Sequence, residues 1–410
     1  MLIAYVRRST SDRFNRRLVS LNFLPIIQNR HEPQTFIPLM KRILKWIVRI
    51  VLVLLVLAFL YVFVAYWRST NDCEKQTSNP ANPMKAVVYC DYGLKNLKLA
   101  DIEKPVPNDD QILVKVHAVS VNPYDWHFIE GTPKVMRGMI GGLRKPKDIR
   151  LGVDFAGTVE TVGKNVTQYK PGDEVFGGAD GAFAQYLCRR ATGSVAPKPA
   201  DLTFEQAASI NIAGITALQG VRDKGKVQPG QKVLINGASG GVGTFAVQIA
   251  KSHGADVTGV CSTRNIELVQ SLGADHVIDY TKEDFTKGDQ KYDVILDNVA
   301  NHSLSECQRV LTPNGIYVMI GGGGANEQGF LGAIGKALKA AVYAHFVKQK
   351  MGMMMAQPNT QDLTLLADMM RSGKIKPVID RTYKSLSEIP DAIRYLEQGH
   401  ARGKVVITVD

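Results

Sequence analysis

The residues with the clearest chemistry lie within Lys232–Lys251, which reads KVLINGASGGVGTFAVQIAK. Val233–Ile235 is a short apolar run of the kind that is buried on both faces of a parallel sheet. Ala238–Gly243 is a turn of small residues, and an unbroken helical pattern begins at Thr244. A strand, a tight turn and a helix in this order bring backbone N–H groups and a helix N-terminus to one point. Such a point attracts a pyrophosphate group.

The glycine pattern is weak by itself, because Ala238 stands at the first glycine of G-x-G-x-x-G. A glycine turn without any ligand is the alternative. The chain that follows supports the phosphate interpretation, since strand and helix patterns continue to alternate over Val257–Cys261, Asn265–Leu272, Val277–Asp279 and Tyr292–Asn298. We therefore expect a dinucleotide-binding α/β domain whose last parallel strand is Gly315–Ile320, with one edge of the sheet free for pairing.

Other elements must hold this domain in place. From Met84 onward, short strand-like runs separated by Gly, Pro and Asp turns extend over roughly 120 residues, which predicts a small barrel or curled sheet. Phe330–Phe346 has the pattern of a basic amphipathic helix. The chain closes with a helix near Ile389–Gln398 and a strand at Lys404–Val409.

The front of the 410-residue chain differs from the rest, since its first 49 residues hold ten of the 50 Lys and Arg residues. Ile50–Trp67 is an uncharged apolar run of 18 residues, with Trp46, Tyr66 and Trp67 as candidate interfacial anchors at its two ends. At about 1.5 Å per residue this run can cross a bilayer. We expect a membrane anchor rather than a cleaved signal peptide, because no small-residue cleavage site follows. No aromatic-basic module follows either, so nucleic acid is not an expected partner. Met40 is an alternative start to Met1.

The side of the membrane on which the catalytic part lies is open, because two observations oppose each other. Four basic residues precede the apolar run, and the positive-inside rule then keeps the N-terminus in the cytoplasm and sends the rest across. The five cysteines are scattered without a C-x-x-C pair. We therefore expect no disulfide framework, and unpaired cysteines fit a reducing compartment. Ser69–Pro83 is polar and rich in Pro and Asn, which is typical of a linker.

From Met84 onward the chain resembles the medium-chain dehydrogenase/reductase superfamily, in its zinc-free quinone-oxidoreductase and enoyl-reductase branch. The motifs that carry the resemblance are Val119–Pro123, Leu151–Gly157, Lys170–Val175, Ala213–Ala217, Ala238–Gly243 and Gly403–Val406. It implies an α/β protein in which a GroES-like β-barrel catalytic domain is split around a Rossmann domain. The expected parts are 1–45 (basic extension), 46–67 (transmembrane helix), 68–83 (linker), 84–205 (GroES-like domain), 206–350 (Rossmann domain) and 351–410 (return to the catalytic domain).

The resemblance also argues against a metal. Zinc relatives carry Gly-His-Glu where this chain has Gly152-Val153-Asp154, so Val153 replaces the histidine ligand. The cysteine ligand expected near Asn122 and the four-cysteine structural lobe are both missing from the sequence. A catalytic zinc needs three protein ligands of N, S or O type, and we therefore expect none.

The cofactor follows from the end of the second strand of the dinucleotide domain. NAD enzymes place Asp or Glu there, whereas this chain has Cys261–Asn265, without a carboxylate. Arg264 suits a 2′-phosphate, so we expect NADPH, although a solvated cation is the alternative for this residue. The resemblance places Tyr280 beside the same phosphate and Lys404 on the pyrophosphate. The expected cofactor-binding residues are Thr216, Ala238, Ser239, Gly240, Gly241, Val242, Gly243, Ser262, Thr263, Arg264, Tyr280, Ile320, Gly321, Gly322 and Lys404.

Without a Lewis acid, hydride transfer suits a conjugated enone, enal or quinone better than a simple ketone, because the developing charge is delocalised. The resemblance places Asn122 and Tyr124 near the nicotinamide, and we expect these two to be the catalytic residues. The alternative is that Asn122 and Asp125 shape the turn while Tyr124 packs. We expect an NADPH-dependent oxidoreductase of small lipophilic electrophiles, anchored in a membrane as a homodimer. A membrane-associated NADPH-binding sensor or scaffold with little turnover is the alternative.

Overall fold

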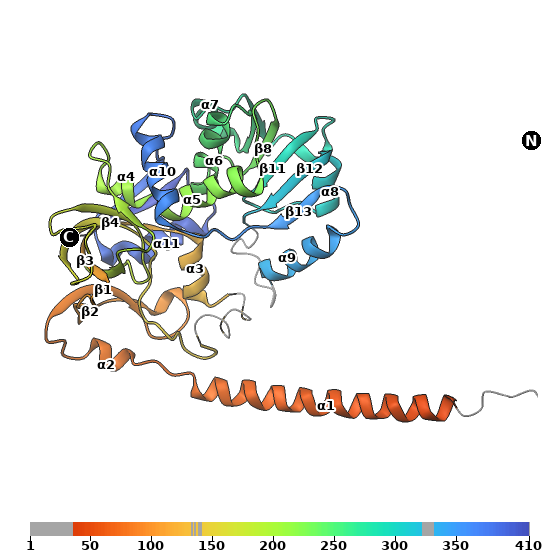
Figure 1. Ribbon diagram of the computed structural model, residues 1–410, viewed down its shortest axis with the longest axis horizontal. Coiled ribbons are helices and arrows are strands. Elements are labelled where there is room, and N and C mark those ends of the chain that lie inside the picture. Colours follow the sequence, from red (N-terminus) through yellow and green to blue (C-terminus); the bar gives the residue numbers. More distant parts are fainter. Residues whose placement is uncertain (1–35, 133, 135–136, 138–141, 322–331, 410) are drawn as a thin grey trace, which may run out of the picture. The chain divides into compact units, whose positions relative to one another are not determined.

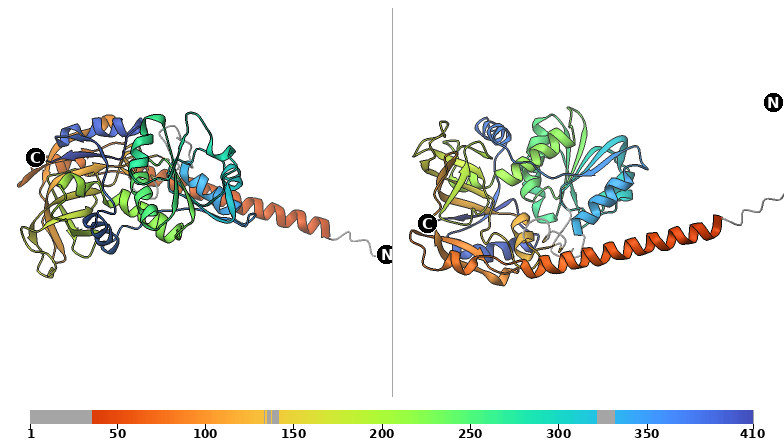
Figure 2. Two further views of the ribbon diagram at one scale, coloured as in Figure 1. Left: turned by 90° about the horizontal axis from the view of Figure 1, so that it is seen from above. Right: turned by 60° about the horizontal axis from the view of Figure 1, so that its bottom comes forward.

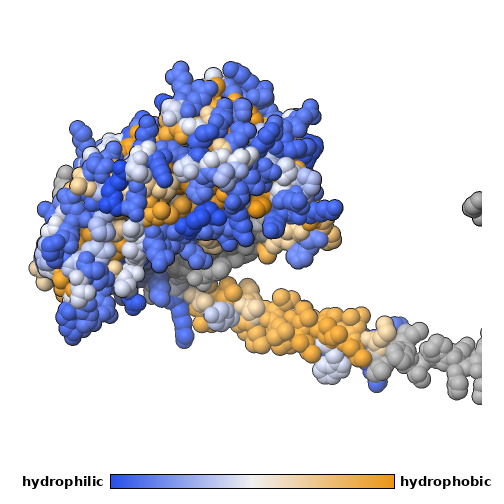
Figure 3. Space-filling view, turned by 45° about the horizontal axis from the view of Figure 1, so that its top comes forward, coloured by the Kyte–Doolittle hydropathy of each residue, from blue (hydrophilic) through white to orange (hydrophobic). Residues whose placement is uncertain are grey.

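The structure is a computed structural model that describes residues 36–132, 134, 137, 142–321 and 332–409 (Figure 1). Contacts divide the chain into two compact units, Met1–Val62 and Phe63–Asp410. The helix α1 (Phe36–Arg68) has 33 residues, and its large apolar side chains from Met40 to Trp67 are exposed (Figure 3). Of the helices that the structure describes, α1 is the one long and apolar enough to cross a membrane.

The second unit begins with a short helix and a strand pair, α2 (Cys73–Thr77), β1 (Pro83–Tyr89) and β2 (Leu97–Glu103). A seven-stranded sheet follows in the order β14-β15-β3-β4-β5-β7, with β6 paired to β3. Its strands are β3 (Gln111–Val121), β4 (Asp154–Val162), β5 (Glu174–Gly178), β6 (Tyr186–Arg190), β7 (Val195–Pro197), β14 (Ile379–Tyr383) and β15 (Lys404–Thr408). The pairing is antiparallel apart from β14 with β15, and Phe155 and Phe183 are fully buried in its core. This sheet confirms the predicted all-β segment.

The second sheet has six parallel strands in the order β10-β9-β8-β11-β12-β13. Its strands are β8 (Lys232–Asn236), β9 (Asp256–Cys261), β10 (His276–Asp279), β11 (Tyr292–Asp297), β12 (Leu311–Met319) and β13 (Lys350–Met353). Val233, Leu234 and Ile235 are completely buried, as expected for a central strand covered on both faces. The chain order reverses between β8 and β11, and sheets of this kind bind ligands at such a switch point.

Helices cover and connect the two sheets. They are α3 (Pro123–Glu130), α4 (Phe204–Ala208), α5 (Asn211–Gln219), α6 (Gly241–Ser252), α7 (Ile266–Ser271), α8 (Leu304–Arg309), α9 (Gly332–Tyr343), α10 (Thr360–Arg371) and α11 (Ile389–Glu397). The last strand, β15, returns to the first sheet, where Val405 pairs with Val121 of β3. In Figure 2 blue C-terminal segments accordingly lie among the orange and yellow strands of the first sheet. The first sheet is therefore split in sequence around the second, as the resemblance implied.

The prediction of the edge strand of the parallel sheet is wrong. Gly315–Ile320 was predicted to be its last strand, but β12 lies between β11 and β13, so β13 forms the edge. The additional strand has four residues and reads KMGM, which is too short and too rich in methionine to carry a strand pattern. The predicted helix at Phe330–Phe346 is present as α9 over its described part.

The expectations for the cysteines and for the linker are also wrong. Cys73 and Cys90 form a disulfide, with their Cα atoms 5.6 Å apart. Residues 73–77 form α2, and the Cys73 side chain is buried, so Ser69–Pro83 is not a free linker. The sequence did not indicate the pairing because tertiary packing, and not a spacing motif, brings the two residues together.

Candidate active site

The predicted strand, glycine turn and helix are present between β8, which ends at Asn236, and α6, which begins at Gly241. Gly237 has a φ of 77°, a conformation that glycine adopts without strain. A Cβ on Gly243 would lie 2.1 Å from the carbonyl oxygen of Gly237, so a side chain there would separate the helix from the turn. Because the first N–H groups of a helix lack intrahelical partners, the turn forms a cradle for a phosphate.

A residue that the sequence reasoning missed joins this turn to the end of β9. Asn265 donates from Nδ2 to Ser239 Oγ at 3.0 Å and to Ser262 Oγ at 3.1 Å. Its own Oδ1 is buried and has no hydrogen-bond partner among the described residues. The side chain therefore fixes two predicted cofactor residues beside each other and leaves one acceptor for a ligand.

The four residues predicted to surround a 2′-phosphate come together at the ends of β9 and β10. Tyr280 follows β10 directly, and 57% of its surface is exposed. Arg264 is exposed and donates from Nη2 to the backbone oxygen of His400 at 2.6 Å. Ser262 and Thr263 precede Arg264 at the end of β9. The segment that precedes β15 thus holds the guanidinium group of Arg264 through the backbone oxygen of His400.

The end of β9 has no carboxylate of its own, as expected, but the neighbouring strand β10 brings Asp279 beside it. Thr263 donates from Oγ1 to Asp279 Oδ2 at 2.5 Å, and Thr281 donates to Oδ1 at 2.7 Å. These hydrogen bonds lower the pKa of Asp279 to about 2. Lys282 lies 3.4 Å from the same carboxylate and offsets its charge.

A buried polar cluster lies at the junction of β3, β4, β15 and α5. Its members are Ser120, Asn122, Asp154, Asn211 and Lys404, each at most 4% exposed. The Asp154 carboxylate accepts from Ser120 Oγ at 2.9 Å, from Asn122 Nδ2 at 3.0 Å and from Asn211 Nδ2 at 2.9 Å. Lys404 Nζ lies 3.2 Å from Asp154 Oδ2 and 2.5 Å from Asn122 Oδ1. The charge of the buried carboxylate is therefore both hydrogen-bonded and paired.

The expected contact of Lys404 with a pyrophosphate stays a prediction, and the structure shows where its ammonium group lies. Besides Asn122 and Asp154, its Nζ lies 3.4 Å from the backbone oxygen of Val121, so its three donors are all used within the protein. A buried carboxylate requires a cationic partner, and Asp154 takes the lysine. The neighbouring Gly403 still reaches the glycine turn, since its N–H donates to Ser239 O at 2.9 Å.

Tyr124 and Asp125 open α3 directly after the cluster. The Tyr124 ring packs on Phe128 with the ring centres 4.3 Å apart, and 43% of the residue is exposed. Burial raises the pKa of Tyr124 to about 12, so its hydroxyl is a donor at neutral pH. Asp125 accepts from Asn122 N–H at 2.7 Å, whereas its Oδ1 is buried and has no hydrogen-bond partner within the described part of the chain. Burial raises the pKa of Asp125 to about 7.

The residues expected along the nicotinamide lie on α5 and after β12. Thr216 is 8% exposed on α5. A Cβ on Gly321 would lie 1.9 Å from the backbone oxygen of Asn298, so this position requires glycine. Ile320 lies directly before Gly321, and Gly322 lies outside the described residues.

A second polar network at the ends of β8 and β11 was missed by the sequence reasoning. Asp297 is fully buried and accepts from Asn236 Nδ2 at 2.9 Å and from Tyr317 OH at 2.8 Å. Asn298 donates to Asn236 O at 2.9 Å, and its Oδ1 is buried without a partner among the described residues. Polar residues at the carboxyl ends of two adjacent parallel strands were the available signal.

No group of three His, Cys, Asp or Glu side chains that is arranged to hold a metal ion occurs in the described part of the chain. A Rossmann sheet with a glycine cradle, joined to a curled antiparallel sheet, defines a nucleotide-dependent oxidoreductase of the two-domain dehydrogenase type.

Comparisons with known proteins identify the family. Residues 272–407 match the family described as zinc-binding dehydrogenase, and residues 108–200 match the alcohol dehydrogenase GroES-like domain. The chain is 35% identical to the trans-enoyl reductase pgmF of Aspergillus terreus over 337 residues, which cover 77% of this chain and 92% of the relative. It is 34% identical to the mitochondrial NAD(P)H oxidoreductase RTN4IP1 of Homo sapiens over 390 residues, which cover 84% and 96%.

The fold gives the same result. The quinone oxidoreductase of Coxiella burnetii superposes with a TM-score of 0.69 at 30% identity, covering 80% of this chain and all of that one. The chain belongs to the medium-chain dehydrogenase/reductase superfamily and is an NAD(P)H-dependent oxidoreductase, similar to quinone oxidoreductases and enoyl reductases.

Proposed function

We propose that the protein transfers hydride from NADPH to quinones or α,β-unsaturated carbonyl compounds without zinc. The observation that carries this proposal is the closed polar cluster around Asp154. This chain has Val153 where zinc relatives have a histidine ligand. The neighbouring Asn122, Asp154 and Lys404 side chains are hydrogen-bonded to one another. Hydrogen-bond donors must then polarise the substrate oxygen, and a conjugated acceptor needs the least polarisation because its developing charge is delocalised. The similarity to an enoyl reductase and a quinone oxidoreductase agrees with these two substrate classes.

Tyr124 is the donor that we assign to the substrate oxygen. The bound NADPH supplies the hydride, and the neutral Tyr124 hydroxyl donates to the enolate or phenolate oxygen that develops. Both N–H bonds of the Asn122 amide are engaged, with Asp154 Oδ2 and with Ser120 O. We therefore assign Asn122 a positioning role, in which its buried amide fixes the start of α3 and so the place of Tyr124.

The choice of NADPH over NADH rests on the end of β9. Arg264 presents an exposed guanidinium group there. The nearby Asp279 carboxylate accepts hydrogen bonds from the Thr263 and Thr281 hydroxyl groups. Because the charge of Asp279 is offset by these donors and by Lys282, a 2′-phosphate meets a net attractive site.

The exposed apolar helix α1 supports a single-pass membrane anchor, which would place the enzyme where lipophilic quinones and enals concentrate. The mitochondrial relatives make a cleaved targeting segment the alternative, and the mass of the mature chain separates the two. We further propose a homodimer formed through the edge strand β13. Light scattering that shows a monomer at high concentration would refute the dimer.

The alternative function is a membrane-associated NADPH-binding sensor or scaffold with little turnover. The decisive experiment measures NADPH and NADH oxidation by the detergent-solubilised full chain with a panel of quinones and enals, with and without a chelator. We expect NADPH consumption that the chelator does not change, whereas a zinc alcohol dehydrogenase treated in parallel loses activity. NADPH binding without turnover of any acceptor would favour the sensor, and loss of activity with loss of bound zinc would refute the metal-free reaction.

A further inference from the structure

We propose that the Cys73–Cys90 disulfide clamps the segment after α1 onto the catalytic unit, and that this unit lies on the oxidising side of the membrane that α1 crosses. The inference rests on the anchor proposed above and adds the side of the membrane. Observations of two different kinds support it, namely the packing around the disulfide and the distribution of charge around α1.

The disulfide lies in a small core of its own. Cys73 is 3% exposed and packs in one cluster with Met84, Val88 and Ile102 of the strand pair β1–β2. The helix α2 has five residues, a length that does not persist in water by itself. Its position therefore depends on Cys73, which the covalent bond to Cys90 holds at the end of β1.

Hydrogen bonds from the residues before α2 complete the clamp. Asn71 donates from Nδ2 to the backbone oxygen of Cys90 at 2.8 Å and to that of Pro146 at 3.1 Å. Ser69 Oγ accepts from the N–H of Arg144 at 3.1 Å. Arg68 alone separates Ser69 from Trp67, the last residue of the apolar run. The segment that is hydrogen-bonded to the catalytic unit therefore begins two residues after the apolar run.

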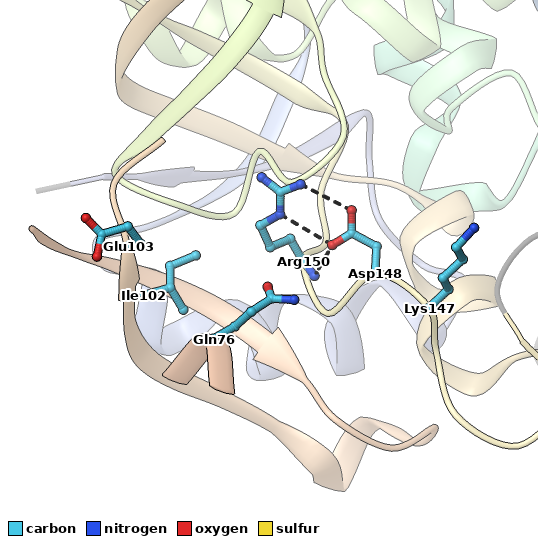
Figure 4. Close-up of a pocket in the computed structure, with 6 residues that line it drawn as sticks. All are labelled: Gln76, Ile102, Glu103, Lys147, Asp148 and Arg150. Atoms are coloured by element: carbon cyan, nitrogen blue, oxygen red, sulfur yellow. Dashed lines mark hydrogen bonds and ion pairs between the residues drawn. The ribbon is translucent and has the colours of Figure 1, made fainter. Parts of the chain in front are cut away.

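The clamped segment also builds a pocket. A cavity of about 490 Å³ is lined by Gln76 of α2, by β2 and by the segment that precedes β4 (Figure 4). The lining residues are Gln76, Ile102, Glu103, Lys147, Asp148 and Arg150. An open linker would leave this cavity without one of its walls, so the disulfide also shapes the surface of the catalytic unit.

The chemistry of disulfide formation and the distribution of charge together indicate on which side of the membrane the catalytic unit lies. Formation of the bond removes two electrons and two protons from the Cys73 and Cys90 thiols, and the disulfide of an oxidised thiol-exchange protein accepts them and becomes two thiols. Such oxidants keep disulfides formed in compartments outside the cytosol. Four basic residues precede the apolar run, whereas only Arg68 and Lys75 follow it, so the positive-inside rule keeps the N-terminus in the cytoplasm. The catalytic unit then lies on the opposite, oxidising side of the membrane, which is also the side that the disulfide indicates. That compartment must then supply the reduced nicotinamide cofactor.

Thiol counting tests the clamp. Cells are quenched in acid, and the denatured full chain is labelled with maleimide-polyethylene glycol before and after reduction. We expect three labels before reduction, on Cys188, Cys261 and Cys307, and five afterwards. The matched Cys73→Ser/Cys90→Ser variant should show three in both cases. Five labels on the wild-type chain without reduction would overturn the clamp.

Protease protection tests the side. In sealed vesicles with the cytoplasmic face outward, a tag after Asp410 should resist protease until detergent is added, and a tag before Met1 should be digested at once. Digestion of the Asp410 tag in intact vesicles would overturn the placement. Recovery of the intact chain in the detergent-free soluble fraction would remove the anchor and the placement together, while the thiol count and the NADPH assay would still report on the clamp and on the enzyme separately.

Discussion

Lys404 Nζ, on the last strand of the chain, lies 2.5 Å from Oδ1 of Asn122, which is 282 residues earlier in the sequence. The same ammonium group is paired with the buried Asp154 carboxylate. Through this contact the C-terminal strand fixes the start of α3, which carries Tyr124. The return of the chain to the first sheet is therefore part of the site as well as of the fold.

The Lys404–Asp154 pair makes a prediction for stability. Lys404→Met should lower the free energy of unfolding by about 3–5 kcal/mol, because it leaves the Asp154 carboxylate buried without its cation. Adding Asp154→Asn should recover part of the loss. Lys85→Met, which removes an exposed ion pair with Asp101, is the control and should cost about 0–1 kcal/mol. Urea denaturation measures all four proteins, and equal small losses for both lysines would contradict the account.

The buried Asp125 makes a prediction for pH dependence. Its pKa in the folded protein, about 7, lies above the ordinary value of 3.8, so the folded state binds the proton more tightly than the unfolded state does. The stability that this proton contributes is complete below about pH 4 and is lost as the pH rises to about 7. The total is on the order of 4 kcal/mol.

Asp125→Asn should remove this dependence, because the amide keeps an acceptor for the Asn122 N–H and cannot ionise. Denaturation curves between pH 4 and pH 8 measure the difference. Asp101→Asn, at a half-exposed position, serves as the control and should follow the wild type. Parallel pH profiles for wild type and Asp125→Asn would contradict the inferred burial of an ionisable carboxyl.

Local patterns predicted those parts of the structure that depend on neighbouring residues. The buried strand Val233–Ile235 and the turn at Gly243 follow from apolar periodicity and from the steric demand of a tight turn. The Cys73–Cys90 bond, the four-residue β13 and the partner of Lys404 depend on contacts between distant segments. No spacing in one sequence encodes such contacts, which explains why the disulfide and β13 were not expected and why the partners of Lys404 were not foreseen.

Asp279 shows the same limit at the cofactor site. The end of β9 was correctly read as lacking a carboxylate of its own, but the adjacent parallel strand β10 contributes one at the same level of the sheet. Strand order, which a single sequence leaves open, decides whether that side chain reaches the site.

Arg264 makes a prediction for cofactor choice. Arg264→Ala should raise the apparent Kd for NADPH by about tenfold to a hundredfold and should leave that for NADH nearly unchanged, because the lost contact is a charge-assisted hydrogen bond to the 2′-phosphate. Lys287→Ala, which removes an exposed ion pair with Asp284, is the control. Titration of cofactor fluorescence measures both values, and equal weakening of the two cofactors would refute the assignment.

Tyr124 makes a prediction for the chemical step. Tyr124→Phe keeps the ring packed on Phe128 and removes the hydroxyl, so kcat should fall by about 100-fold or more while NADPH affinity stays unchanged. Tyr186→Phe on β6 is the control and should retain activity. Stopped-flow measurement of a single turnover separates the chemical step from product release. An unchanged single-turnover rate would exclude Tyr124 as the donor.

The most direct test of the central claim follows the hydride itself. The full chain in detergent, with its zinc content measured and a chelator present, is given NADPH that carries deuterium at nicotinamide C4 together with an α,β-unsaturated aldehyde. The account predicts a saturated product that carries the deuterium on the β-carbon, formed while the protein holds no stoichiometric metal. Binding of the labelled cofactor with no deuterium in any product, or transfer that stops when bound zinc is removed, would contradict it.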